Sequence, residues 1–155
     1  MPETAPHAPL TVRPATPADR DAVSALLKES ELPLAGIPHG LEHFFIAESG
    51  GELMGAIGLE QYGIAALLRS AVVRPSHRGT GAGASLVRAV LAHAASVGVE
   101  EIGLLTTTAE HWFPRFGFER TDRTALPAAL FASAEFQGAC PETAVAMRRR
   151  LKTED

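Results

Sequence analysis

The spacing of hydrophobic residues predicts a single α/β chain in which helices and strands alternate. Apolar residues recur at helical spacing in residues 17–30 and again in a long segment that begins after the turn at 78–83 and stops at Gly98. Alternating or wholly apolar runs predict strands at 10–13, 44–48, 53–59, 65–73, 101–106 and 143–151. This order indicates a mixed sheet, with three consecutive antiparallel strands followed by a crossover helix and a parallel strand.

The remaining segments are less regular. The run at 65–73 is almost wholly apolar, so we expect a central strand that is covered on both faces. Residues 109–116 are expected to form a short helix, and residues 118–141 to be irregular or partly helical. We expect one domain at 10–151, preceded by a flexible tail at 1–9 that contains three prolines.

Composition restricts the class of protein. The chain has 155 residues and a net charge of -4, and this balance argues against a non-specific nucleic-acid binder, which needs a surplus of basic residues. The longest apolar runs are too short to cross a bilayer, and residues 1–9 lack the pattern of a signal peptide. We therefore expect a soluble cytoplasmic domain without membrane contact. A single cysteine, Cys140, excludes an internal disulfide and a cysteine-based zinc site, and we expect no metal.

A glycine-rich turn stands between the buried strand and the long helix. Its sequence is Arg78-Gly79-Thr80-Gly81-Ala82-Gly83. Glycines at such a place let backbone N–H groups approach an anion, and the helix start adds about half a positive charge. The turn lacks the lysine of a P-loop and the glycine spacing of a dinucleotide-binding fold. It therefore predicts a phosphate site of another type, with a merely flexible turn as the alternative.

The same turn resembles the GNAT superfamily of acyl-CoA-dependent N-acetyltransferases. The pyrophosphate-binding pattern of that family is [Gln/Arg]-x-x-Gly-x-[Gly/Ala], and residues 78–83 match it at each required position. Residues 109–118 are similar to the family's A-x-x-x-[Tyr]-x-x-x-G-F segment, and the predicted strand order is also the family's. The resemblance spans residues 10–151. It implies a mixed, mostly antiparallel central sheet flanked by helices, with acetyl-CoA in the splay between the fourth and fifth strands.

The resemblance also implies roles for individual residues on the cofactor side. Backbone groups of Val72 and Val73 would pair with the pantetheine arm, and the Val73 N–H would donate to the thioester carbonyl. Thr106 stands where an asparagine often contacts the pantetheine, and Phe113 stands where many relatives carry a tyrosine that protonates the leaving thiolate. The residues expected to hold the pyrophosphate are Arg78, Gly79, Thr80, Gly81, Ala82 and Gly83.

The missing tyrosine affects the expected mechanism. The one tyrosine of the chain, Tyr62, is predicted on a different strand from Phe113, so the usual acid is absent. A thiol with a pKa of about 8.5 can leave as an anion, and a positioned acid typically contributes ~10²–10⁴-fold. Its loss would slow the reaction without abolishing it.

The acceptor amine needs to lose a proton before it can attack. An amine with a pKa of about 10.4 is roughly 0.04% neutral at pH 7, so a nearby carboxylate has to take up the proton. Glu60 is our candidate because it ends a strand beside the buried strand, and a solvated acid is the alternative. Arg69 and Ser70 interrupt the apolar run. Arg69 either binds a carboxylate or arsonate-like group of the substrate or pairs with Glu60.

The acceptor pocket is expected beneath residues 36–40, as the corresponding segment covers it in the family, which makes His39 a candidate substrate-binding residue. A narrower resemblance, to the ArsN-like proteins of arsenic-resistance operons, is carried by 58–63, 67–70, 104–108, 133–136 and 140–141. It implies acetylation of an arsenic- or phosphinate-containing amino acid.

The sequence thus predicts an enzyme that moves an acetyl group from acetyl-CoA directly to the primary amine of a small molecule, without a covalent enzyme intermediate. The alternatives are a non-catalytic acyl-CoA-binding regulator and an enzyme that acetylates a protein amine or an aminoglycoside. We also allow for a homodimer.

Overall fold

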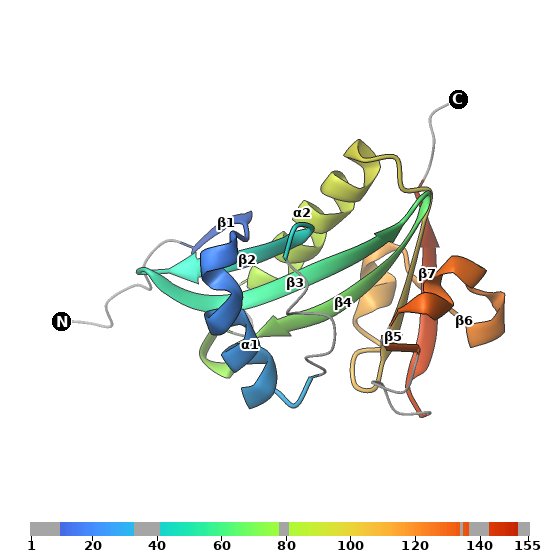
Figure 1. Ribbon diagram of the computed structural model, residues 1–155. Helices are drawn as coiled ribbons and strands as arrows, with labels where there is room; N and C mark the ends of the chain where they lie inside the picture. Colours follow the sequence, from blue (N-terminus) through green and yellow to red (C-terminus); the bar gives the residue numbers. More distant parts are fainter. Residues whose placement is uncertain (1–9, 33–40, 78–80, 134, 137–142, 152–155) are drawn as a thin grey trace.

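One twisted sheet organises the chain (Figure 1). The computed structural model describes residues 10–32, 41–77, 81–133, 135–136 and 143–151. Within them, seven strands lie in the order β1-β2-β3-β4-β5-β7-β6. The strands are β1 Leu10–Pro14, β2 Phe44–Ser49, β3 Glu52–Tyr62, β4 Ala65–Val73, β5 Glu101–Thr106, β6 Glu119–Thr121 and β7 Val145–Arg150.

The pairing pattern confirms the predicted mixed sheet. Strands β1 to β4 pair antiparallel in succession, β4 and β5 pair parallel, and β7 pairs antiparallel to both β5 and β6. The sheet is therefore mostly antiparallel, with a single change of direction at the β4–β5 pair among the described strands. This is the predicted GNAT-like fold class.

Helices cover both faces of the sheet (Figure 1). The helix α2 (Ala82–Ser96) buries Leu86, Val87 and Val90 against one face. The helix α1 (Arg20–Glu29) buries its apolar stripe against the opposite face, which is also covered by two 3-10 helices near β7. The 3-10 helices are η1 Pro17–Asp19, η3 Pro75–His77, η4 Phe113–Phe116, η5 Arg123–Ala125 and η6 Ala128–Ala132.

An ion-pair network fixes the start of α1 to the first two strands. Arg13 on β1 donates to both carboxylate oxygens of Asp19, each at 3.0 Å, and to Glu48 on β2 at 3.0 and 3.1 Å. Asp19 also accepts from the backbone N–H of Thr16 at 2.7 Å, which closes the first turn in the way expected of a helix start. The predicted helix at 17–30 is thus confirmed as η1 followed by α1.

A bulge interrupts the ladder between β3 and β4. Gly58 lies opposite Arg69 and Ala56 lies opposite Val72, so β4 has one more residue than β3 between these two pairs. Ser70, inside the bulge, has a left-handed φ of 61°. A bulge of this kind bends its strand and increases the local twist.

The bulge also changes which side chains of β4 face α2. Before it, Leu68 packs in the cluster with α2, and Leu67 packs on the opposite face with η6. After it, Val73 packs on the α2 side and Val72 on the α1 side. Odd-numbered positions therefore lie on one face before the bulge and on the other face after it.

The parallel pair opens directly before the bulge. The last paired residues of β4 and β5 are Leu68 and Leu104, although β4 continues to Val73 and β5 to Thr106. The twist introduced by the bulge carries the end of β4 away from β5, which leaves a splay between the two strands.

Several local expectations need correction. The strand β3 runs to Tyr62 rather than 59, so Glu60 lies inside the strand and not at its end. The short helix predicted at 109–116 is a 3-10 helix over Phe113–Phe116, and the irregular stretch after it contains the unpredicted strand β6. The predicted tail at 1–9 lies outside the described residues.

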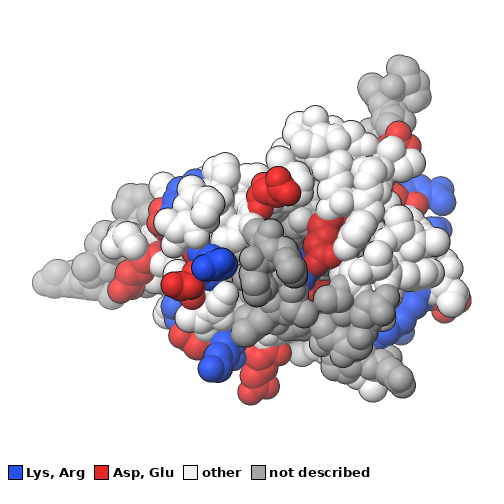
Figure 2. All heavy atoms as spheres, in the orientation of Figure 1, with Lys and Arg blue, Asp and Glu red and all other residues white. Residues whose placement is uncertain are grey.

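Charged side chains of both signs are mixed on one face of the molecule. On the face shown in Figure 2, the described Lys and Arg side chains are interspersed with Asp and Glu rather than gathered into one basic area. No helix among the described residues is long and apolar enough to cross a membrane.

Candidate active site

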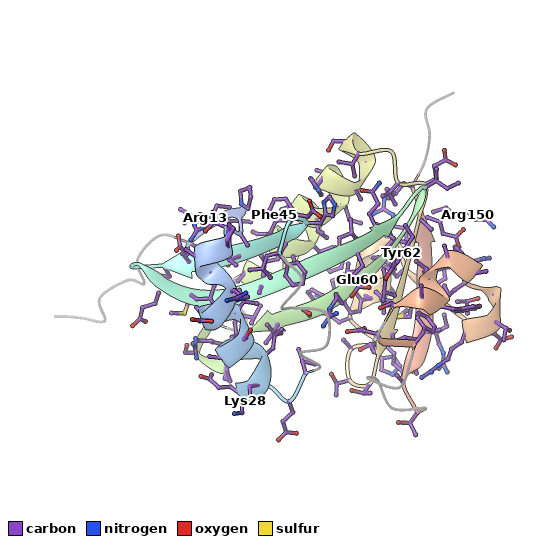
Figure 3. The ribbon with its side chains drawn as sticks, viewed as in Figure 1. Arg13, Lys28, Phe45, Glu60, Tyr62 and Arg150 are labelled. Carbon is purple, nitrogen blue, oxygen red and sulfur yellow. The ribbon has the colours of Figure 1, made fainter. Side chains whose placement is uncertain are left out.

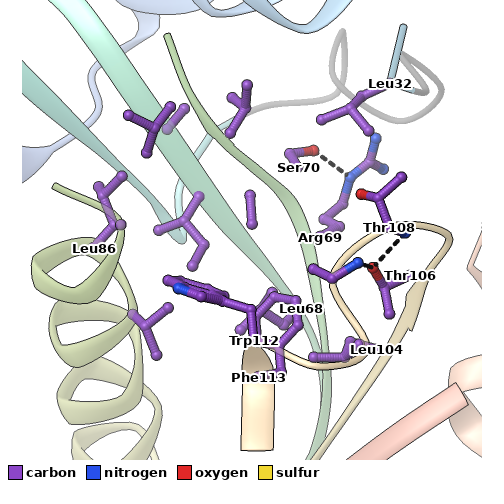
Figure 4. A pocket seen from close by; sticks show the side chains of 18 of the residues that line it. Leu32, Leu68, Arg69, Ser70, Leu86, Leu104, Thr106, Thr108, Trp112 and Phe113 are labelled. Carbon is purple, nitrogen blue, oxygen red and sulfur yellow. Dashed lines mark hydrogen bonds between the residues drawn. The ribbon is translucent and has the colours of Figure 1, made fainter. Parts of the chain in front are cut away.

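A cleft of about 920 Å³ occupies the splay between β4 and β5. Its walls come from the second half of β4, the end of β5 and the turn after it, the first turns of α2, the segment around η4, and the residues that follow α1. Figure 4 shows two parts of this cleft, with Leu86 and Trp112 on the α2 side of β4 and Arg69 and Ser70 on the other side. The cleft therefore joins an apolar part to a polar part across the edge of one strand.

The backbone of β4 presents polar groups to the cleft. The N–H of Arg74 donates to the carbonyl of Met54 on β3 at 2.7 Å. Because successive residues of an antiparallel strand point their N–H groups to opposite sides, the N–H of Val73 points away from β3 and toward the splay. This orientation is the one that the predicted role of Val73 requires. Val73 lines the cleft together with Val72, whose side chain is buried on the α1 side.

The start of α2 forms one end of the cleft. Gly81 and Gly83 line it, and Gly81 has a φ of +89°, a conformation that favours glycine. A Cβ at Gly83 would lie 3.1 Å from Cζ2 of Trp112, so the indole packs directly against the helix start. Ala82 is buried beneath them. The other residues of the predicted phosphate turn, Arg78, Gly79 and Thr80, lie outside the described residues.

The residues after β5 form the floor of the apolar part. The ring of Phe113 is buried and packs edge-on against Trp112 and Phe118, at centroid distances of 5.0 and 5.6 Å. The hydroxyl of Thr106 accepts hydrogen bonds from the backbone N–H groups of Ala109 at 2.9 Å and Thr108 at 3.4 Å. Thr106 and Phe113 therefore both line the cleft, and the hydroxyl of Thr106 also holds the turn that leads to η4.

The polar part is built around a buried arginine. The Nη1 of Arg69 donates to Oε2 of Glu60 at 2.7 Å, and its Nε donates to the hydroxyl of Ser70 at 3.0 Å. Oε2 of Glu135 lies 3.5 Å from the same Nε. The Tyr62 hydroxyl donates to Oε1 of Glu60 at 2.6 Å, and Figure 3 shows these two side chains next to one another on β3. The pairing of Arg69 with Glu60, one of two predicted alternatives, is confirmed.

The pKa values in this network follow from its hydrogen bonds. Burial alone would raise the pKa of Glu60, but hydrogen bonds from Tyr62, Arg69 and Ser133 to its carboxylate outweigh burial and lower the pKa overall. Burial and the contact with Glu60 raise the pKa of Tyr62 to about 12. Glu60 is therefore ionised and weakly basic, and Tyr62 stays protonated.

This geometry bears on two of the sequence predictions. Among the described residues, the cleft lining includes Arg69 and Ser70 but neither Glu60 nor Tyr62. The role of Glu60 as base stays a prediction, and its contacts give it a clear structural task as the partner of Arg69. His39, the other predicted substrate-binding residue, lies outside the described residues.

Two strained residues also mark the cleft. In the part of the chain that the structure describes, the non-glycine residues with a positive φ are Glu31 at 59° and Ser70 at 61°. Both line the cleft, one after α1 and one in the β4 bulge. Left-handed backbone at such residues costs free energy and tends to occur at functional sites.

Sequence reasoning missed two of the cleft residues. Glu135 is 4% exposed and lines the cleft, but the sequence places it in an irregular stretch without periodicity. Nothing in the local sequence marks Trp112 as a cleft residue, and it lines the cleft because its ring packs against the start of α2. Among the described residues, no group of three or more His, Cys, Asp or Glu side chains is placed to hold a metal ion.

Comparison with known protein families agrees with the fold and the cleft. Residues 40–120 match the acetyltransferase (GNAT) domain family, and this range covers just over half of the chain. The chain belongs to the GNAT acetyltransferase family of enzymes.

Several individual proteins are similar to this chain. An amino-acid acetyltransferase of Ralstonia nicotianae is 34% identical over 89 residues, which are 56% of this chain and 20% of that protein. The N-acetylglutamate synthase of Neisseria gonorrhoeae, solved with coenzyme A and N-acetyl-glutamate, has a TM-score of 0.79 at 23% identity, over 96% of this chain and 37% of that chain. A Mycobacterium tuberculosis protein solved in complex with CoA has a TM-score of 0.76 at 20% identity, over 92% of this chain and 99% of that chain.

The overlap with these relatives is partial. The chain spans about a fifth of the length of the curated relative and little more than a third of the N-acetylglutamate synthase chain. The two named enzymes are described by amino-acid and N-acetylglutamate chemistry, and they lend no support to the arsenic-resistance branch.

Proposed function

We propose that this chain transfers the acetyl group of acetyl-CoA to the amine of a small amino acid. The observation that carries the proposal is the cleft in the β4–β5 splay, which places an outward-facing backbone N–H of Val73 between an apolar and a polar part. The names of the amino-acid acetyltransferase and the N-acetylglutamate synthase support an amino acid as the acceptor.

The described residues suit acetyl-CoA. Leu86, Trp112 and Phe113 offer an apolar wall to the pantetheine arm. The start of α2, with Gly81 and Gly83 at the cleft, offers backbone N–H groups and the positive end of the helix dipole to the pyrophosphate. The N–H of Val73 is directed so that it would stabilise negative charge on the thioester oxygen as the amine attacks.

The polar part suits the acceptor. Arg69 and Ser70 line it on the side of β4 away from α2. The amine of the acceptor attacks the thioester carbon directly, and coenzyme A leaves as the thiolate. The resemblance to arsenic-resistance proteins adds phosphinothricin and arsinothricin, which are themselves amino acids, to the acceptors that deserve a test.

Binding of coenzyme A can be followed through the one tryptophan of the chain. Because Trp112 packs against the start of α2, we expect a saturable change in its fluorescence when coenzyme A is added. In Gly83→Val, the added Cβ alone would lie 3.1 Å from the indole and 3.7 Å from the side chain of Val73, so the larger side chain should weaken binding at least ~10-fold. Ala95→Val, at an exposed position on the last turn of the same helix, is the matched control.

Turnover is tested by release of the coenzyme A thiol. The acceptor panel contains glutamate, glutamine and other amino acids, phosphinothricin, arsinothricin, a lysine peptide and an aminoglycoside. We expect turnover with at least one amino acid and a much slower rate with the peptide and the aminoglycoside. Saturable coenzyme A binding without turnover of any amine would contradict the proposed function.

A further inference from the structure

Two histidine side chains face one another where α2 crosses the start of β2. His43 lies directly before β2, and His93 lies in the last turn of α2. Nδ1 of His43 is 2.8 Å from Nε2 of His93, and the two ring centroids are 5.0 Å apart. Because the two residues lie 50 positions apart in the chain, no spacing motif marks the pair. The folded sheet and helix bring the two rings together.

Neighbouring groups hold both histidines in place. The N–H of Leu59 on β3 donates to the carbonyl of His43 at 3.1 Å. The N–H of Val97 donates to the carbonyl of His93, also at 3.1 Å. The ring of Phe45 packs edge-on against the ring of His93 at a centroid distance of 5.5 Å. Both histidines are partly exposed, so solvent reaches the pair. The two nitrogens therefore face one another in a fixed and accessible place.

Each of the facing nitrogens can offer a lone pair. A hydrogen bond between two ring nitrogens needs one donor and one acceptor, so at least one of them already carries a lone pair. In a neutral imidazole the hydrogen resides on either nitrogen. A shift of the hydrogen to the far nitrogen of the donor ring therefore leaves lone pairs on both facing nitrogens. Neutral imidazole is the commonest side-chain ligand of metal ions, and it suits nickel, copper and zinc.

The distance between the two nitrogens favours one coordination geometry. A metal ion binds imidazole nitrogen at about 2.0–2.1 Å. Two such bonds at a right angle place the nitrogens about 2.8–3.0 Å apart, whereas a tetrahedral angle places them about 3.3–3.4 Å apart. The observed 2.8 Å matches the right angle. Right angles between nitrogen ligands are typical of the square-planar and tetragonal sites of Cu²⁺ and Ni²⁺.

We propose that His43 and His93 form a binding site for Cu²⁺ or Ni²⁺ that is separate from the cleft. Nδ1 of His43 and Nε2 of His93 are its two protein ligands, and water fills the other positions, since no group of three or more possible ligands occurs among the described residues. The described lining of the cleft includes neither histidine. His93 lies ten positions after Gly83 on α2, about 15 Å along the helix from the cleft. A bound ion would join the last turn of α2 to the start of β2.

The effect of Ni²⁺ on thermal stability tests this site. An ion that binds the folded chain and not the unfolded chain stabilises it, so we expect a saturable rise in Tm of at least ~2 °C over the protein in EDTA. His43→Gln and His93→Gln should each lose the rise, with the Tm of each variant in EDTA as its own baseline. His111→Gln, which removes a ring that is 94% exposed, is the matched control and should keep the rise. Mg²⁺, which prefers oxygen ligands, should give none.

Two further measurements identify the ligands directly. Calorimetric titration with Ni²⁺ should show one ion per chain, with an affinity at least ~10-fold weaker in His43→Gln and in His93→Gln. Electron paramagnetic resonance of Cu²⁺ bound to the wild type needs no variant, and we expect hyperfine coupling to the nitrogens of two imidazoles. A spectrum with one imidazole or none, or an Ni²⁺ affinity that His93→Gln leaves unchanged, would overturn the inference. So would a rise in Tm that His111→Gln abolishes.

Discussion

Replacing Gly58 with alanine tests the packing beside the β4 bulge. A Cβ at this position would lie 2.3 Å from Cζ of Phe44 and 2.5 Å from both of its Cε atoms. Ordinary contacts begin at 3.4 Å, so the ring would have to move by about 1 Å. Phe44 is 5% exposed and packs in the cluster between α1 and the sheet, which leaves little room for this movement.

The expected cost follows from two opposing effects. Overpacking of a core costs about 1–3 kcal/mol, and complete loss of a phenylalanine's packing costs about 3–5 kcal/mol. Replacing glycine also lowers the entropy of the unfolded chain, which returns about 0.4–1 kcal/mol. We therefore expect Gly58→Ala to lower the free energy of unfolding by about 2–3 kcal/mol, which corresponds to a fall in Tm of roughly 5–10 °C.

Urea denaturation of four proteins measures this effect: wild type, Gly58→Ala, Phe44→Ala and the double variant. If the clash with the ring is the cause, Gly58→Ala should cost less than about 0.5 kcal/mol once Phe44→Ala has removed the ring. A single-variant cost below about 1 kcal/mol, or costs that simply add in the double variant, would refute the reasoning.

Three further predictions concern charged groups. Arg69→Met removes the cation that pairs with Glu60 and Glu135, and it should lower the free energy of unfolding in urea by about 3 kcal/mol. Adding Glu60→Gln should restore part of this loss, and no restoration would contradict the ion-pair account. The hydrogen bond from Arg13 lowers the pKa of Asp19 from 3.8 to about 2, so its stabilising effect is present above pH 3.8 and disappears as pH falls through 2. Asp19→Asn should flatten this acid limb by about 1 kcal/mol, after allowance for solvent screening, and a limb as steep as the wild type's would argue against the assignment. Burial and the neighbouring His43, whose Nδ1 lies 2.8 Å from Nε2 of His93, lower the pKa of His93. The unfolded chain therefore binds more protons, stability should fall as pH drops below about 6.5, and melting curves from pH 7.5 to 5 should show a weaker fall for His93→Gln.

The sequence was informative where a local pattern determines the structure. The bounds of β4 and β5 match the predicted 65–73 and 101–106, because long apolar runs between turn residues have few other solutions. The strand β6 was missed because its three residues carry no alternation, and it forms only because β7 offers a partner. The bulge was not predicted either, since a register shift depends on the neighbouring strand.

The residues of the cleft also include some that the sequence predicts and some that it does not. The ion pair of Arg69 with Glu60 is predictable, because a charge inside an apolar strand needs a partner and Glu60 lies on the neighbouring strand. Glu135 gave no such signal, because its contact with Arg69 joins residues that are far apart in the chain. Long-range contacts of this kind come from the tertiary fold and not from spacing.

The bulge in β4 also governs which changes of length this strand can accept. Deleting Ser70 or Ala71 would remove the bulge and restore a regular ladder with β3, in which Val72 and Val73 still lie opposite Ala56 and Gly55. The side chain and the N–H of Val73 would keep their directions, but β4 would lose the extra twist that carries its end away from β5, and the cleft between the two strands would narrow. Ala71 is exposed, so this position should accept many replacements but no deletion. Related chains that keep the cleft are therefore expected to vary here in residue type while keeping the number of residues constant.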